Sequence, residues 1–181
     1  MEKLFPIRKF TRLKSFDYSS VGAYFVTVCT EGRKQILSEI VKTTSIKRHK
    51  PTNTTVGEGL APPEYSVKLK PCGDVVVEQL RLLEKRFPNV SVEDYIIMPD
   101  HLHVIILIHK NAGGASPSPT LNNIVCVLKS LSSRICKQQY GVEKIFQRSF
   151  YDHVIRNHDD YNEIVNYIYE NPQRWYYKHQ N

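Results

Sequence analysis

The sequence lacks several features that mark particular classes of protein. Its four cysteines are too widely spaced for a CxxC zinc or redox pair, so we expect buried thiols at Cys29, Cys72, Cys126 and Cys136. The longest aliphatic run, residues 104–108, is far shorter than the ~20 residues of a membrane helix. The opening segment MEKLFPIRKF has neither the apolar stretch nor the cleavage site of a secretion signal. These absences predict a cytoplasmic protein without a membrane span.

Acidic residues are scarce relative to basic ones. The chain of 181 residues carries 25 Lys and Arg against 18 Asp and Glu, which gives a formal net charge of +7. This excess favours a polyanionic partner, because a basic surface gains free energy by displacing counterions from phosphates. The alternative is a basic protein whose charge serves only its solubility. The length suits one buried core, so we expect a single domain over residues 1–181.

The pattern of apolar residues predicts alternating strands and helices. Strands are expected at residues 22–30, 92–98, 102–108 and 145–155. Helices are expected from an N-cap at Asp74 to Pro88, over 121–140, and from the capping pair Asn157 and Asp160 to about Asn171. A tight turn at residues 99–100 should join the middle two strands as a hairpin. This order predicts an α+β fold with a ferredoxin-like βαββαβ core, in which an antiparallel sheet carries helices on one face, plus a C-terminal helix.

Two stretches are expected at the surface. Residues 41–70 are rich in Thr, Lys, Pro and Gly, which predicts a surface insertion or a protruding hairpin without catalytic residues. Residues 111–119 hold two Gly and two Pro and are expected to form a loop. In the helix over 121–140, the side chains expected to face inward are Leu121, Ile124, Val125, Leu128, Leu131 and Ile135. The side chains expected on its other side are Lys129, Ser132, Ser133, Arg134 and Lys137.

Two histidines stand two residues apart at the start of the third predicted strand. Because side chains alternate along a strand, His101 and His103 should project from the same face of the sheet. A metal ion could then bind both imidazoles; the alternative is a pair of half-buried, hydrogen-bonded histidines. Asp100 either orients one imidazole or serves only as a turn residue.

The last predicted helix contains three tyrosines that helical geometry separates. Tyr161 falls within its apolar stripe, whereas Tyr167 and Tyr169 lie on opposite flanks of that stripe. Asn171 points within about 40° of Tyr167 but about 160° away from Tyr169. Only Tyr167 therefore shares a face with a further possible oxygen ligand. The alternative for Tyr167 is an aromatic side chain packed at the edge of the core.

Three segments carry a resemblance to a known family: YIIMPDHLHVIILI, QRSFYDHVIRNHDDY and IVNYIYENPQRW. Together and in this order they resemble the single-tyrosine HUH transposases, especially the REP-associated tyrosine transposases of bacteria. The resemblance covers most of the chain apart from residues 41–70. It implies that His101 and His103 bind a divalent metal, Mg²⁺ or Mn²⁺, with Asn171 as third ligand and Tyr167 as nucleophile. Asn171 departs from the family pattern, in which this position is often glutamine.

The resemblance implies a DNA transposase-like endonuclease and strand transferase. Tyr167 would attack a phosphodiester of single-stranded DNA with hairpin or inverted-repeat structure, giving a 5′-phosphotyrosine and a free 3′-hydroxyl. Related transposases form dimers, so a homodimer and a monomer are both open. Candidate phosphate contacts, each alternatively a solvated surface charge, are Lys129, Arg134, Lys137, Arg148 and Arg156.

Other readings of the same residues belong to different classes of protein. A non-catalytic hairpin-DNA binding protein would keep the basic surface but would not need the two histidines, Tyr167 and Asn171 together. An RNA-recognition module on the same fold would display aromatic residues on its central strands, where this chain has histidines and aliphatic residues. A relaxase or replication initiator shares the chemistry but is usually larger.

Overall fold

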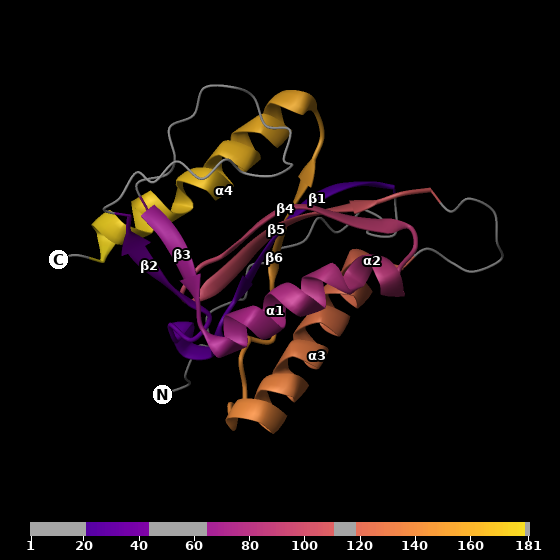
Figure 1. Cartoon of the computed structure of the whole chain (residues 1–181). Helices are drawn as coiled ribbons and strands as arrows, with labels where there is room; N and C mark the ends of the chain where they lie inside the picture. Colours follow the sequence, from indigo (N-terminus) through magenta and orange to yellow (C-terminus); the bar gives the residue numbers. More distant parts are fainter. Residues whose placement is uncertain (1–20, 44–64, 111–118, 180–181) are drawn as a thin grey trace, which may run out of the picture.

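The computed structural model describes residues 21–43, 65–110 and 119–179, and these form three layers (Figure 1). The middle layer is a four-stranded antiparallel sheet in the order β4 (Val90–Ile97), β5 (His101–Ile108), β1 (Gly22–Cys29) and β6 (Tyr151–Ile155). One face is covered by α1 (Pro71–Arg81), α2 (Leu83–Arg86) and α3 (Leu121–Tyr140). The other face is crossed by α4 (His158–Lys178). This arrangement confirms the predicted ferredoxin-like core with a C-terminal helix.

The strand β5 is buried on both faces of the sheet. Leu102, Val104 and Ile106 belong to the core beneath α1 and α3, whereas Ile105 belongs to a smaller core beneath α4. Burial on both faces explains why β5 reads as a nearly continuous apolar run. His101 and His103 are the polar exceptions in this strand, and the two-residue period puts them on the α4 face.

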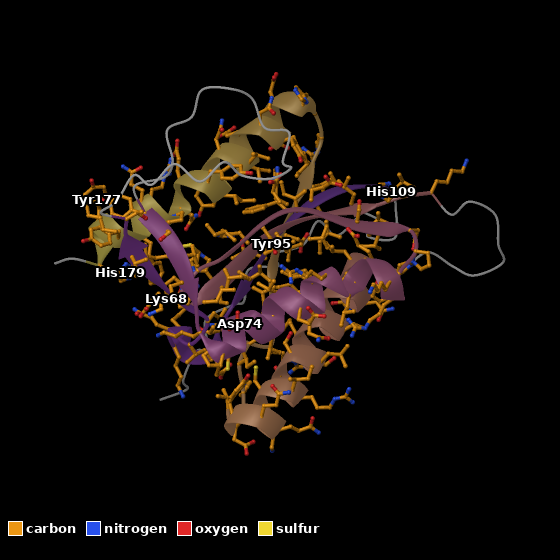
Figure 2. The ribbon with its side chains drawn as sticks, viewed as in Figure 1. Lys68, Asp74, Tyr95, His109, Tyr177 and His179 are labelled. Carbon is orange, nitrogen blue, oxygen red and sulfur yellow. The ribbon has the colours of Figure 1, made fainter. Side chains whose placement is uncertain are left out.

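A second, two-stranded sheet braces the C-terminal half of α4. It consists of β2 (Ser38–Lys42) paired antiparallel with β3 (Tyr65–Leu69). Of the stretch 41–70, residues 44–64 lie outside the described residues, so the surface insertion or protruding hairpin expected there stays a prediction. The ring of Tyr65 packs against those of Tyr176 and Tyr177, with centroids 4.6 and 5.7 Å away. Figure 2 shows Tyr177 at this end of α4. The hairpin is therefore part of what holds α4 in place.

The expected lack of a membrane span agrees with the described helices, whereas the expected burial of the cysteines holds for three of the four. No helix among the described residues combines the length and the apolar character that a bilayer crossing requires. All four thiols are free, and Cys29, Cys72 and Cys136 are buried as expected, but Cys126 is exposed because it lies on the outer side of α3. Burial, together with a hydrogen bond to Cys72, raises the pKa of the Cys136 thiol to about 12. Of the predicted loop, residues 111–118 lie outside the described residues.

The first helix begins earlier than predicted. Asp74 is not its N-cap; the cap position is Lys70, and Pro71 and Asp74 (Figure 2) both lie in the first turn. Proline suits that position because its missing N–H is one that a helix start leaves unpaired in any case. The predicted single helix is also divided at Leu82 into α1 and α2, and it ends at Arg86, just before Pro88 as expected.

Three other boundaries or faces differ from prediction. Ser132 is buried on α3, because the side that packs against α1 follows Leu128, Ser132 and Cys136 at four-residue spacing. The strand predicted over 145–155 is restricted to β6, since the segment before it turns inward and buries Ile145, Phe146 and Phe150 in the main core. Finally, α4 does not stop near Asn171; it continues through Pro172 to Lys178.

The close approach of α1 to the backbone before β2 depends on one glycine. A Cβ built on Gly73 would lie 2.0 Å from the carbonyl oxygen of Leu37 and 3.3 Å from a methyl carbon of Leu69. The same oxygen accepts a hydrogen bond of 2.9 Å from the N–H of Lys70. The start of α1 can therefore pack against this backbone only where no side chain intervenes.

We predict that Gly73→Ala destabilises the protein, although alanine normally stabilises a helix relative to glycine. Relieving a clash with a backbone carbonyl requires the helix to move, and such overpacking typically costs about 1–3 kcal/mol. Urea unfolding measures the change, with the exposed Glu78→Ala on the same helix as control, expected within about 0.5 kcal/mol of wild type. A Gly73→Ala protein as stable as the control would contradict this account of the packing.

Candidate active site

The two histidines meet on the sheet face that α4 crosses. Their ring centroids are 4.5 Å apart with an interplanar angle of 75°, and both side chains are buried. The cross-strand partners of His101 and His103 on β1 are Cys29 and Thr27. The sequence prediction that both imidazoles share one face is confirmed.

A buried carboxylate orients His101. The Nδ1 atom of His101 lies 2.5 Å from Oδ1 of Asp100, and Nε of Arg33 lies 2.9 Å from Oδ2 of the same side chain. An ionised carboxylate only accepts hydrogen bonds, so Nδ1 carries the proton and Nε2 keeps its lone pair. Of the two roles open for Asp100, the structure supports orientation of the imidazole.

Arg33 reaches Asp100 from the short 3-10 turn η1 (Glu31–Arg33), which the sequence analysis did not single out. Its backbone has φ 56°, in the left-handed region that costs a non-glycine residue about 1–2 kcal/mol. The guanidinium also donates to Sγ of Cys29 at 2.8 Å. Two side-chain contacts at the site thus accompany the unfavourable backbone conformation.

The other histidine is held by a hydroxyl. Thr27 Oγ1 lies 2.8 Å from Nδ1 of His103, and a hydroxyl can accept from Nδ1–H, which leaves the lone pair on Nε2. That Nε2 atom is fully buried and has no hydrogen-bond partner among the described residues. Buried polar atoms without a partner are uncommon and point to a missing ligand or a functional role.

Burial keeps both imidazoles neutral. Desolvation lowers the pKa of His101, partly offset by the Asp100 carboxylate. Desolvation, reinforced by the nearby His101 and Arg33, lowers the pKa of His103 to about 3. Both rings are therefore unprotonated at neutral pH, the state in which imidazole binds metals.

Tyr167 lies directly beside this pair. Its ring centroid is 5.3 Å from that of His103 and 6.1 Å from that of Phe25, in edge-to-face contacts, and 38% of the residue is exposed. No hydrogen bond joins its hydroxyl to any of the described residues. The Cζ atom of Arg174 lies 5.7 Å from the ring centroid. Tyr167 thus presents, near the two imidazoles, a phenol that is unbonded within the described part of the chain.

The other two tyrosines of α4 are tied to the opposite flank. Tyr161 and Tyr169 donate to the two carboxylate oxygens of Asp94, each at 3.2 Å. Burial, followed by the Asp94 charge, raises the pKa of both phenols. Asp94 sits at an irregularity in the pairing of β4 with β5. The predicted separation of Tyr167 from Tyr169 is confirmed, and Tyr161, which was placed in the apolar stripe, is half-buried and packs against the smaller core.

Helix α4 contributes further side chains beyond the tyrosine. Asn171 is buried one turn after Tyr167, on the same face, as predicted. Because the helix continues past Pro172, Arg174 and Lys178 follow on this face at the next two turns. These cations were missed because the predicted helix ended near Asn171; continuing the helical spacing would have found them.

These residues line one cleft of about 560 Å³. Its lining comprises Thr27, Cys29, Arg33, His101, His103, Gln147, Tyr151, Tyr167, Asn171, Arg174, Trp175 and Lys178. The cleft therefore combines two neutral imidazoles, the amides of Gln147 and Asn171, the phenols of Tyr151 and Tyr167, and three cationic side chains. It is a polar site with cationic side chains, of which Arg33 pairs with Asp100 and Arg174 with Glu170 at 2.6 Å.

The basic residues predicted to contact phosphate are not in this lining. Lys129 donates to the carbonyl oxygens of Arg148 and Ser149 at 2.7 and 3.4 Å, and burial lowers its pKa. Lys137 pairs with Glu143 at 2.7 Å. Arg134, Arg148 and Arg156 are exposed elsewhere. The structure does not bring these five together with the histidines, and their contacts with DNA stay predictions.

The residues present fit a divalent cation at the histidine pair. Within the described segments, no group of three or more His, Cys, Asp or Glu side chains is arranged to hold a metal. The donors here are instead two imidazoles, with the buried Nε2 of His103 lacking a partner, and the Asn171 amide. Nδ1 partners such as Asp100 and Thr27 are typical of metal-binding histidines.

The different anchoring of the two tyrosines predicts different effects on stability. Tyr169→Phe removes a hydrogen bond to a carboxylate and should lower the free energy of unfolding by about 0.5–1 kcal/mol, the low end for such bonds because Tyr169 is 55% exposed. Tyr167→Phe removes a hydroxyl without a partner among the described residues and should leave stability within about 0.5 kcal/mol of wild type. Equal losses in denaturant unfolding would show that the hydroxyls are not distinguished as described.

Comparisons with known proteins bear on the fold. No family model matches the sequence. An uncharacterized protein of Haemophilus influenzae is 25% identical over 183 residues, spanning 93% of this chain and 89% of that protein. A solved REP-associated tyrosine transposase bound to a REP hairpin has a TM-score of 0.54 at 21% identity, covering 90% of this chain and 74% of its own. A candidate transposase of Deinococcus radiodurans is 17% identical with coverages of 89% and 96%, but its TM-score of 0.45 is too low to carry an argument. The chain is thus similar in fold to the hairpin-bound transposase.

Proposed function

We propose that this chain is a metal-dependent endonuclease and strand transferase of single-stranded DNA, with Tyr167 as its nucleophile. The observation that carries the proposal is the convergence of Tyr167, His101, His103 and Asn171 on one cleft. These are the four residues to which the resemblance to single-tyrosine HUH transposases assigns chemistry. The shared fold with a REP-associated transposase supports the same assignment.

His101 and His103 would hold Mg²⁺ or Mn²⁺ through their Nε2 atoms, with the Asn171 side-chain oxygen as a third ligand. When bound, the cation supplies positive charge that neutralises a phosphate oxygen in the transition state. Asp100 and Thr27 keep each imidazole in the required orientation through Nδ1. Asn171 is buried and lines the same cleft as the two imidazoles.

Tyr167 performs the exchange of phosphodiesters. Its phenolic oxygen attacks phosphorus, the bond from phosphorus to the 3′ oxygen breaks, and a 5′-phosphotyrosine and a 3′-hydroxyl result. The phenolic proton leaves to solvent, to which Tyr167 is open, and the 3′ oxygen gains a proton. Arg174, beside the ring, adds positive charge at the phosphate. Attack by a 3′-hydroxyl on the phosphotyrosine reverses the step and joins strands without a nucleotide cofactor.

The substrate class follows from the cleft and from the fold relative. The nucleophile lies in a polar cleft beside a sheet, so it needs a phosphate that is accessible and flexible. Single-stranded DNA offers such a phosphate more readily than a duplex does. The REP-associated transposase of the same fold binds a REP hairpin, and this suggests a hairpin next to the single strand. The net charge of +7 favours such a partner.

A second candidate is a hairpin-DNA binding protein without catalysis. The basic cleft alone would suit that role, but it gives no reason for a buried imidazole nitrogen without a partner among the described residues. The intact set of four residues favours the enzyme.

We predict that His101→Ala and His103→Ala each lower cleavage of a hairpin-bearing single strand by about 100-fold or more, because a bound cation contributes several kcal/mol to the transition state. Most binding should remain, since phosphate contacts supply affinity. EDTA should act likewise. His109→Ala is the matched control, because His109 follows β5 at its other end and bonds to Ser91 outside the cleft (Figure 2). Full cleavage in EDTA would show that cleavage does not require a divalent metal ion.

The nucleophile is tested by the covalent adduct. Tyr167→Phe should abolish the protein–DNA adduct while fold and DNA affinity persist, because one hydroxyl is lost and little apolar surface. Tyr169→Phe should retain substantial cleavage, since its hydroxyl faces Asp94. End-labelled substrate with Mn²⁺, denaturing gels and peptide mapping give the measurement. An adduct that survives Tyr167→Phe, or maps to another tyrosine, would identify a different nucleophile.

A further inference from the structure

We infer that Tyr151 forms a stacking subsite for an unpaired nucleobase next to the phosphate at the histidine pair. The inference rests on the proposed function and deepens it, because it concerns how the same cleft holds a single strand. Tyr151 lies in the segment QRSFYDHVIRNHDDY, but the resemblance assigns it no role and the mechanism above does not use it.

The register of the sheet places Tyr151 in one row with His103. Thr27 on β1 pairs with His103 on β5 and with Tyr151 on β6. Residues directly opposite each other on antiparallel strands project from the same face, so all three side chains face the cleft. Two strand spacings put Tyr151 about 10 Å from His103 along this row. Thr27 lies between them, and its small side chain is hydrogen-bonded to His103, so it leaves space between the two larger rings.

The Tyr151 side chain is open although it lines the cleft. It is 56% exposed, and it makes no ring contact or hydrogen bond with any residue that the structure describes. It also stands on β6, which forms one end of the four-stranded sheet, so no further strand of that sheet covers its outer side. A large aromatic surface left open on a cleft floor is what base stacking requires.

Neighbouring groups suit a nucleotide rather than an apolar ligand. Gln147 lines the same cleft, and its backbone N–H donates to the carbonyl oxygen of Cys29 at 2.9 Å, which fixes this stretch before β6 against β1. Its side-chain amide can both donate to and accept from the edge of a base. Arg33 and Lys178 also line the cleft and provide cations for the backbone phosphates. Aromatic and basic side chains in one groove are the combination that single strands recognise.

The row of His103, Thr27 and Tyr151 sets the path of the single-stranded DNA. With a phosphate at His101 and His103, a nucleotide joined to it extends over Thr27, and its base meets the ring of Tyr151. Stacking of one base on an aromatic ring is sequence-tolerant, so the subsite selects for an unpaired base and not for a particular one. A base held in a duplex cannot occupy it.

The test uses a DNA hairpin with a single-stranded flank in which 2-aminopurine replaces one flank nucleotide at a time. Stacking quenches 2-aminopurine fluorescence, so wild type should quench strongly at one or two adjacent positions. Tyr151→Ala should lose that quenching and bind the flanked hairpin roughly 5- to 100-fold more weakly. Tyr151→Phe should keep both, since it retains the ring. Tyr140→Ala, a 47% exposed tyrosine at the end of α3, is the matched control and should behave as wild type.

The possible results separate failure of the Tyr151 subsite from failure of the proposed function. Unchanged position-specific quenching in Tyr151→Ala overturns the subsite, while adduct formation on Tyr167 in the same protein would leave the proposed function standing. Loss of quenching in Tyr151→Phe as well as in Tyr151→Ala would assign the contact to the hydroxyl and overturn stacking. Failure of wild type to bind the flanked hairpin at all would overturn both the subsite and the proposed function.

Discussion

The hydrogen bonds at the Nδ1 atoms of His101 and His103 determine what these side chains present to the cleft. Asp100 accepts from one ring and Thr27 bonds to the other, and both partners are fixed by the sheet and its hairpin turn. With Nδ1 occupied and the rings neutral, the remaining nitrogens are free to bind a cation. Burial makes this arrangement costly unless a ligand satisfies Nε2 of His103. The site is therefore built into the central strands, where it cannot shift independently of the core.

The nucleophile depends on a different set of contacts, those that fix the rotation of α4. Apolar packing on Ile105 and Ile155 attaches the helix to the sheet but does not by itself set its roll. Asp94 holds one flank through two phenols, and the β2–β3 hairpin holds the C-terminal half through the ring of Tyr65. Tyr167 is left facing His103. The described end of the segment of unusual composition, from Tyr65 onward, therefore supports the site, and no described residue of that segment lines the cleft.

Local periodicity was enough to predict much of the fold and the centre of the site. The two-residue period of a strand put His101 and His103 on one face, and helical geometry separated Tyr167 from Tyr169. Residues brought in by strand pairing or by a turn, such as Thr27 and Arg33, could not be found in this way, because their spacing along the chain has no period. The helix end was wrong for a related reason: Pro172 signals a stop locally, whereas tertiary contacts beyond it keep the helix intact. A positive charge alone was not enough to predict the contacts of Lys129, because its ammonium group donates to a carbonyl oxygen within the protein.

We propose that the two histidines, together with Asn171, bind a divalent metal ion beside Tyr167. Electron paramagnetic resonance of the purified protein loaded with Mn²⁺ tests it most directly, because nitrogen nuclei bound to the ion produce resolvable couplings. The account predicts couplings from two imidazole nitrogens in wild type, one in His103→Ala, and two in His109→Ala. Bound Mn²⁺ without imidazole couplings, or with couplings unchanged in His103→Ala, would contradict it.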